Sequence, residues 1–191
     1  TEHPGLHAAL ASNMLRRCGR RPTDVARALI VDRLERAIQD DIGARGIAPL
    51  VRRGALYQCA LSLVNPSVRS VAIVTGFPCV SNHNPPTETD GPPGAMAIAH
   101  ALRRLGKQPH IVTDDSSGAV MQAAVQAASA CSEASSPDIL LTIVPRDCTR
   151  SQFEANIAPS ILSGVQHVLA IERAGPASDG SCYTMSGRNI S

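Results

Sequence analysis

Aromatic residues are almost absent from this chain of 191 residues, which has two phenylalanines, two tyrosines and no tryptophan. Proteins that bind single-stranded nucleic acid stack the bases on aromatic side chains, and nucleic-acid-binding surfaces are rich in basic residues. Here 18 basic residues face 16 acidic ones, for a formal net charge of only +2. We therefore expect no nucleic acid among the partners of this protein.

Long apolar runs and paired cysteines are missing as well. No stretch approaches the roughly 20 apolar residues that a membrane-spanning helix needs, and no signal-peptide pattern opens the chain. The six cysteines are far apart and never form a C-x-x-C pair, which favours reduced thiols over a disulfide framework or a structural zinc site. We expect an intracellular protein without a membrane partner, and organellar targeting stays open.

Two nucleotide-binding motifs are also absent. Neither the G-x-G-x-x-G pattern of dinucleotide-binding folds nor the P-loop pattern occurs. A metal-dependent phosphotransfer or hydrolase domain is therefore the least favoured of the functions considered for this chain.

Segments of strand length and helix length alternate over most of the chain. The expected strands are 71–75, 110–113, 139–144 and 167–171, and the helices between them are 94–105, 118–131 and 152–162. Such alternation predicts a three-layer, Rossmann-like α/β fold with a mainly parallel sheet between helices. Right-handed crossovers would bring the carboxyl ends of all strands to one edge.

The N-terminal part has a different character. Residues 24–41 repeat apolar residues with the 3.6-residue period of an amphipathic helix, and shorter helices are expected at 6–17 and 55–63. We expect a helical segment, 1–54, that packs on an α/β domain formed by residues 55–191. Its apolar faces could also contact a second subunit, so a homo-oligomer stays open.

The segment from Ser70 to Gly94 is where we expect the functional site. Its loop follows the carboxyl end of a buried strand, where ligands bind in open α/β sheets. Asp90 can cap the helix that Pro92 opens, and the helix start can receive an anion on its backbone N–H groups. Cys79 is a candidate catalytic thiol if His83 acts as its base, although a packed cysteine is more common.

Acidic residues follow each of the four expected strands. They are Glu88 and Asp90, Asp114 and Asp115, Asp147, and Glu172, which Arg173 follows. Carboxylates gathered at one edge can bind Mg²⁺ or Mn²⁺, for which Asp114 and Asp115 are the candidates, or can serve in acid–base chemistry. Alternatively, Asp114 or Asp115 caps the helix after Ser116, and Asp147 caps the helix near Ser151.

Five segments resemble the C-terminal domain of the D-glutamate cyclase family. They are Thr75-Gly76-Phe77, Glu88-Thr89-Asp90-Gly91-Pro92-Pro93-Gly94-Ala95, Val112-Thr113-Asp114, Ile171-Glu172-Arg173-Ala174-Gly175, and Asp179-Gly180 through Tyr183, Met185 and Gly187 to Ile190. The similarity covers about 55–191, and the run from Glu88 to Gly94 is its most specific part. Family domains continue into a further glycine-rich acidic segment, so we expect this chain to be truncated at its C-terminus.

The resemblance implies a three-layer α/β domain that converts D-glutamate to 5-oxo-D-proline with loss of water, in the mitochondrial matrix in animals. A cytoplasmic location is the other expectation. The expected catalytic residues are Glu88, Asp90 and Glu172. The expected substrate-binding residues are Thr75, Gly76, Thr89, Gly91, Gly94, Asp114, Arg173 and Tyr183. The alternative is a non-catalytic module that binds an acidic metabolite.

Overall fold

The structure is a computed structural model that describes residues 22–44, 46–79, 83–84, 86–88, 90–130 and 138–191. The chain divides into two compact units, Thr1–Asn65 and Pro66–Ser191. The helix expected at 6–17 lies outside the described residues. The assignment of residues 55–191 to one domain stays a prediction.

The N-terminal unit contains the helices α2 (Pro22–Ile38) and α3 (Ala55–Val64), with the short 3₁₀ helix η1 (Ala48–Leu50) between them. The buried Glu35 carboxylate of α2 accepts hydrogen bonds from the backbone N–H groups of Gly54, at 2.6 Å, and Leu56, at 2.8 Å. These groups lie at the start of α3, where backbone donors have no partner within the helix. Glu35 therefore holds the start of α3 against α2.

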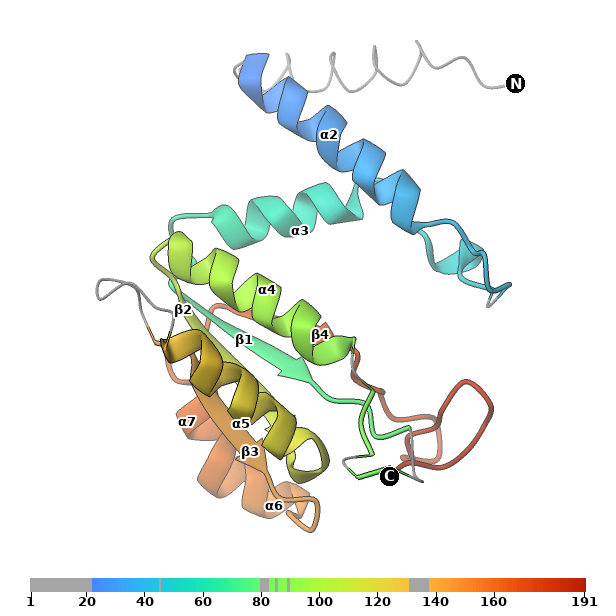
Figure 1. Ribbon diagram of the computed structural model, residues 1–191, viewed down its shortest axis with the longest axis vertical. Coiled ribbons are helices and arrows are strands. Elements are labelled where there is room, and N and C mark those ends of the chain that lie inside the picture. Colours follow the sequence, from blue (N-terminus) through green and yellow to red (C-terminus); the bar gives the residue numbers. More distant parts are fainter. Residues whose placement is uncertain (1–21, 45, 80–82, 85, 89, 131–137) are drawn as a thin grey trace. The chain divides into compact units, whose positions relative to one another are not determined.

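The second unit is built on four parallel strands, β1 (Ser70–Thr75), β2 (Gln108–Asp114), β3 (Leu140–Val144) and β4 (His167–Ile171). Helices α4 (Gly91–Arg104) and α5 (Asp115–Ala130) cover one face of the sheet (Figure 1). The other face carries α6 (Arg150–Gln152), the π-helical turn η2 (Phe153–Ile157) and α7 (Ala158–Leu162). The predicted three-layer α/β fold is confirmed.

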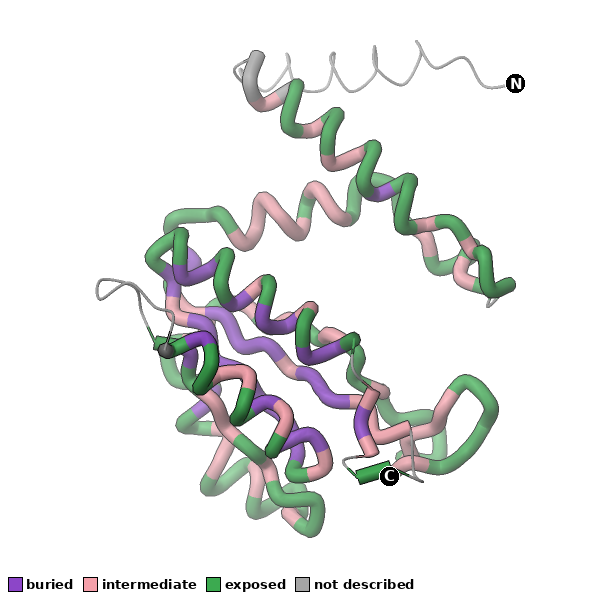
Figure 2. Tube along the Cα trace, viewed as in Figure 1, coloured by how far each residue is buried: buried purple, intermediate pink, exposed green. Residues whose placement is uncertain are grey.

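The core is centred on β1 and β2, which are the most buried strands in Figure 2. Val71, Ile73 and Ile111 are fully buried. Neighbouring residues in a strand face opposite sides of the sheet, and Ala72 and Val112 form a second cluster with Ile161 of α7. Because both faces are covered, β1 and β2 are apolar without alternation, which is why the sequence predicted them well.

The strand order is β3-β2-β1-β4. After β1, the chain crosses through α4 and α5 to β2 and β3 on one side, and then returns through α6 and α7 to β4 on the other side. The direction of winding therefore reverses between β1 and β4. In open α/β sheets, ligands bind in the crevice at the carboxyl ends of the two strands that flank such a reversal.

No helix within the described ranges is both long enough and apolar enough to span a membrane.

Candidate functional site

Three carboxylates meet at the point where the winding reverses. Glu88 and Asp90 come from the loop after β1, and Glu172 directly follows β4. Their carboxylate oxygens lie within 4.8 Å of one another. The structure thus brings together the three residues that were predicted to be catalytic, and we call them the acidic cluster. Their catalytic role stays a prediction.

The backbone of Glu172 reaches this position in an unusual conformation. Its φ of 49° lies in the left-handed region, which non-glycine residues seldom adopt. It also lies against Gly91, because a Cβ atom placed on Gly91 would be 2.8 Å from the Cβ of Glu172 and 3.2 Å from Thr75 Oγ1. A glycine at position 91 is therefore what allows the chain after β4 to approach the start of α4.

Asp90 occupies the N-cap position of α4 but makes no capping hydrogen bond through its side chain. The reason is local chemistry. An N-cap side chain accepts from the N–H of the second or third helical residue, and here these residues are Pro92 and Pro93, which have no N–H. The expected cap is thus wrong, and the Asp90 carboxylate is left to the acidic cluster.

The expected anion site on backbone N–H groups is also smaller than the sequence suggested. Pro92 and Pro93 offer no donor, and the Gly94 N–H donates to the Asp90 carbonyl at 3.2 Å. Among residues 91–94, Gly91 is the one whose N–H can still serve a ligand. The positive end of the α4 dipole adds to the attraction for an anion there.

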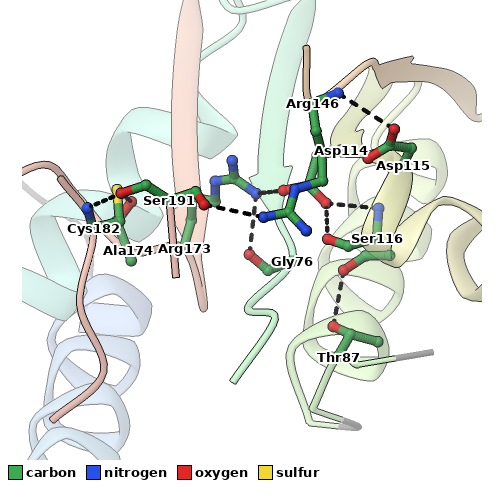
Figure 3. Close-up of polar contacts among 11 residues, drawn as sticks. Gly76, Thr87, Asp114, Asp115, Ser116, Arg146, Arg173, Ala174, Cys182 and Ser191 are labelled. Carbon is green, nitrogen blue, oxygen red and sulfur yellow. Dashed lines mark hydrogen bonds and ion pairs between the residues drawn. The ribbon is translucent and has the colours of Figure 1, made fainter. Parts of the chain in front are cut away.

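Arg173, which directly follows Glu172 of the acidic cluster, forms an ion pair with Asp114 (Figure 3). Arg173 Nη1 donates to Asp114 Oδ2 and to the Gly76 carbonyl, the latter at 3.3 Å. Asp114 Oδ1 also accepts from the Ser116 backbone N–H at 3.1 Å and from the Ser116 hydroxyl. Asp114 therefore caps the start of α5, and its charge offsets the guanidinium that was expected to clamp a substrate carboxylate.

The protonation of Asp114 follows from these contacts. Burial alone would raise the pKa of Asp114, but the hydrogen bonds from Ser116 and Arg173, together with the Arg173 charge, hold the pKa below its ordinary value of 3.8. Asp114 is thus ionised at neutral pH and engaged with Arg173. It makes a poor ligand for a metal ion in this arrangement.

The remaining acidic candidates lie outside the cluster. Asp115 Oδ2 accepts from the Arg146 backbone N–H at 3.3 Å. The expected cap by Asp147 is wrong, because α6 is capped by Thr149 in a capping box with Gln152. The capping box was recognisable in the sequence, because Thr149 and Gln152 have the Thr-x-x-Gln spacing of that motif.

Of the other expected binding residues, Thr89 lies outside the described residues. Gly94 lies in α4, and a Cβ there would make an ordinary contact of 3.6 Å with Ile171. The Tyr183 hydroxyl donates to Asp179 Oδ2 at 2.5 Å. Tyr183 also pairs with Asn189 in an isolated β-bridge, so its visible contacts are within the C-terminal loop.

A layer of buried hydroxyl groups lies beside the acidic cluster, and sequence reasoning found only Thr75 among them. Thr75 Oγ1 and Thr113 Oγ1 are buried and have no hydrogen-bond partner within the described part of the chain. Ser117 Oγ donates to Thr87 Oγ1 at 2.8 Å. In the sequence, these residues could be recognised only as serine or threonine within or directly after an apolar strand. Such residues are common at these positions, so they are weak evidence for a functional site.

Gly76 packs against this layer. Its φ is 115°, and a Cβ there would lie 2.8 Å from both Thr113 Oγ1 and Ser117 Oγ. Only glycine fits such a backbone conformation at such a close approach. The predicted importance of Gly76 thus has a steric reason, while any contact with substrate stays a prediction.

Cys79 does not have the properties of a nucleophile. Burial, a hydrogen bond to Glu88 and the negative charge of Glu88 raise the pKa of the Cys79 thiol from 9.0 to about 11. The thiolate, which is the reactive form, is therefore scarce at neutral pH. The thiol instead contacts one carboxylate of the acidic cluster.

A cation fits the acidic cluster in two ways. Hard oxygen ligands suit Mg²⁺ or Mn²⁺, and the same carboxylates can hold a protonated amine. Negative charges this close repel one another unless a cation lies between them. The acidic cluster is accordingly a better candidate cation site than Asp114 and Asp115, which were the residues expected for a metal.

Comparison with known proteins identifies the family. Residues 34–191 match the family described as D-glutamate cyclase-like, C-terminal. A human protein named mitochondrial D-glutamate cyclase is 38% identical over 164 residues, which are 82% of this chain and 25% of that protein. The chain thus spans about a quarter of the length of this relative. The matched range includes all four strands and the acidic cluster, and the chain belongs to the D-glutamate cyclase-like family.

Proposed function

We propose that this chain converts D-glutamate to 5-oxo-D-proline at the acidic cluster. The observation that carries the proposal is the meeting of Glu88, Asp90 and Glu172 where the winding of the sheet reverses. The reaction is suggested by the name of the human relative. Glu88, Asp90 and Glu172, which were predicted to be catalytic, are the residues that we propose carry it out.

The reaction needs a site that accepts a positive charge and removes a proton. The α-amine of glutamate must lose its extra proton and attack the carbon of the γ-carboxyl group. A C–N bond then forms and a C–O bond breaks. The departing oxygen receives the two protons that the nitrogen loses, one of them by way of the carboxylate that acts as base, and leaves as water. The acidic cluster attracts the α-ammonium group, and one carboxylate takes its proton while the substrate is held in a bent conformation. Holding the two reacting groups together lowers the barrier by several kcal/mol in comparable reactions.

The opposite end of the substrate needs a positive environment. The Gly91 N–H and the positive end of the α4 dipole lie beside the acidic cluster and can receive the γ-carboxyl group as negative charge develops on it. Arg173 is held by Asp114 and the Gly76 carbonyl, so we assign it the role of fixing the loop after β4. This role differs from the carboxylate clamp expected from the sequence.

The acidic cluster would also be the place for Mn²⁺ or Mg²⁺, held by Glu88, Asp90 and Glu172. A bound metal ion would polarise the γ-carboxyl group of the substrate. The residues of the chain would still have to orient the substrate and accept the proton from its amine.

The experiment is proton NMR of the protein with D-glutamate and, separately, with L-glutamate, each with Mn²⁺ and with a chelator. We expect signals of 5-oxoproline from the D-enantiomer. Glu88→Gln, Asp90→Asn and Glu172→Gln should each lower turnover by about 100-fold or more, as loss of a general base does. Asp147→Asn is the matched control, because this exposed acid follows β3 and lies outside the cluster.

Two outcomes would overturn the proposal. If the folded protein gives no 5-oxoproline under any condition but broadens the signals of one ligand, the chain is a binding module for an acidic metabolite. If the control variant loses as much activity as the cluster variants, the reaction occurs elsewhere. The mitochondrial location of the human relative is a further proposal for this chain, which fractionation of cells would test.

A further inference from the structure

A cavity of about 470 Å³ lies between the sheet and the elements η2 and α7. These two elements cover the face of the sheet away from α4 and α5 (Figure 1). Its floor is formed by Val74, Val112, Val144 and Val168, one valine from each strand, and Phe153 and Ile161 form part of its wall. Glu88, Asp90 and Glu172 are not among the residues that line it. The cavity thus adjoins the acidic cluster through Gly76, Asp114 and Arg173, which are among its lining residues, without including the three carboxylates themselves.

The cavity becomes polar only at the carboxyl ends of the strands. Asp114, Arg146 and Arg173 line this part. The Arg173 charge is offset by Asp114, with which it is paired. Arg146 is exposed, and one of its N–H groups donates to the Ser191 carbonyl at 3.2 Å (Figure 3). A guanidinium has five N–H donors, so Arg146 retains the capacity to bind a further acceptor.

Size and polarity together define the ligand. Small-molecule sites are typically cavities of this size, mostly apolar with a few polar groups that fix orientation. D-glutamate does not suit this one, because its charged groups are at both ends and the apolar floor would leave one end without hydrogen bonds. An alkyl chain with a single carboxylate matches both parts, since guanidinium pairs well with carboxylate.

We infer that this cavity is a second ligand site that binds an amphipathic monocarboxylate, with its apolar chain on the valine floor and its carboxylate on Arg146. The inference concerns a site and a ligand class beyond the proposed cyclisation of D-glutamate.

The test is saturation-transfer NMR of the whole chain with octanoate as the probe, alongside octan-1-ol and glutarate. We expect octanoate to receive saturation on its alkyl protons and to bind at least fivefold more tightly than either control compound. Arg146→Gln should weaken octanoate at least fivefold. Arg150→Gln is the matched control, because Arg150 is an exposed arginine paired with Glu154 outside the cavity, and it should leave the affinity unchanged.

A second variant tests the floor of the cavity. Val168 lies on an edge strand with 54% of its surface exposed, so Val168→Trp can fill the cavity without displacing the core. We expect it to abolish octanoate binding and to preserve the circular dichroism spectrum. The inference is wrong if octanoate does not bind, if octan-1-ol binds equally well, or if a folded Val168→Trp variant binds as tightly as the unchanged chain.

Discussion

At the scale of single residues, Gly91 controls the geometry of the acidic cluster. A Cβ on Gly91 would approach the Cβ of Glu172 to 2.8 Å, which forces one of the two segments to move. We expect Gly91→Ala to cost about 1–3 kcal/mol of stability, as overpacking does. Because Glu172 is displaced from Glu88 and Asp90, turnover of D-glutamate should fall by more than the loss of folded protein explains.

Gly94→Ala is the control for this prediction. A Cβ at Gly94 meets Ile171 at 3.6 Å, an ordinary contact, and alanine favours a helix. Urea denaturation and NMR turnover of both variants would separate the effects. Equal stability and activity in Gly91→Ala and the unchanged chain would show that Glu172 does not depend on the close approach.

His110 makes the stability of the fold depend on pH. Burial lowers the pKa of His110 below its ordinary value of 6.5, and its Nε2 lies 2.8 Å from Thr142 Oγ1. The unfolded chain therefore binds a proton at a higher pH than the folded chain. This contribution to stability is complete above about pH 6.5 and is lost as the pH falls below that value towards the folded-state pKa.

The measurement is the free energy of unfolding in urea at several pH values between 7.5 and 5. We expect stability to decrease across this range, and His110→Gln should reduce the decrease. His100→Gln, which changes an exposed histidine on α4, should behave like the unchanged chain. If His110→Gln keeps the full pH dependence, another group is responsible for it.

At the scale of elements, Glu35 links two helices of the N-terminal unit. The residue is 3% exposed, and its carboxylate accepts hydrogen bonds from two backbone N–H groups at the start of α3. Hydrogen bonds to a charged group are worth about 1.5–3 kcal/mol, so Glu35→Ala should destabilise α3 by roughly 2 kcal/mol. Hydrogen exchange of the α3 amides would report the loss directly.

Asp32→Ala is the matched change on the same helix. Asp32 pairs with Arg36 on the surface at 2.9 Å, and such exposed pairs contribute about 0–1 kcal/mol. Its effect on α3 exchange should be small. Similar exchange rates in the two variants would mean that Glu35 does not secure the start of α3.

The strands were predictable because each is a short apolar run bounded by turn residues. The first and last residues of the helices were less predictable. The helix expected at 152–162 begins at Arg150 and contains a π-helical turn, and α4 begins at Gly91, before its two prolines. Residue type alone predicted helix caps at Asp90 and Asp147, and both predictions were wrong. Asp90 has no N–H group to accept from, because Pro92 and Pro93 follow it, and at α6 the hydroxyl of Thr149 takes the capping position instead of Asp147.

At the scale of the whole molecule, the order of the strands determines which residues meet at the candidate site. The sequence placed acidic residues after every strand, but it could not show which strands are neighbours. Because β4 pairs with β1, Glu172 meets Glu88 and Asp90, whereas Asp147 after β3 lies outside that cluster. The pairing of Asp114 with Arg173 depends on the same long-range arrangement, as does the buried hydroxyl layer beside Gly76.

The division between Asn65 and Pro66 predicts that residues 66–191 fold alone. The four strands and the elements α4, α5, α6, η2 and α7 come from this unit, and its first residues are held within it. Gln166 Oε1 accepts from the Arg69 and Ser70 N–H groups, both at 2.9 Å, and Lys107 Nζ donates to the Val68 carbonyl. We expect the fragment to unfold cooperatively and its amide NMR signals to match those of the whole chain. A fragment with helical circular dichroism but no dispersed signals would show that the N-terminal unit is needed to order the sheet.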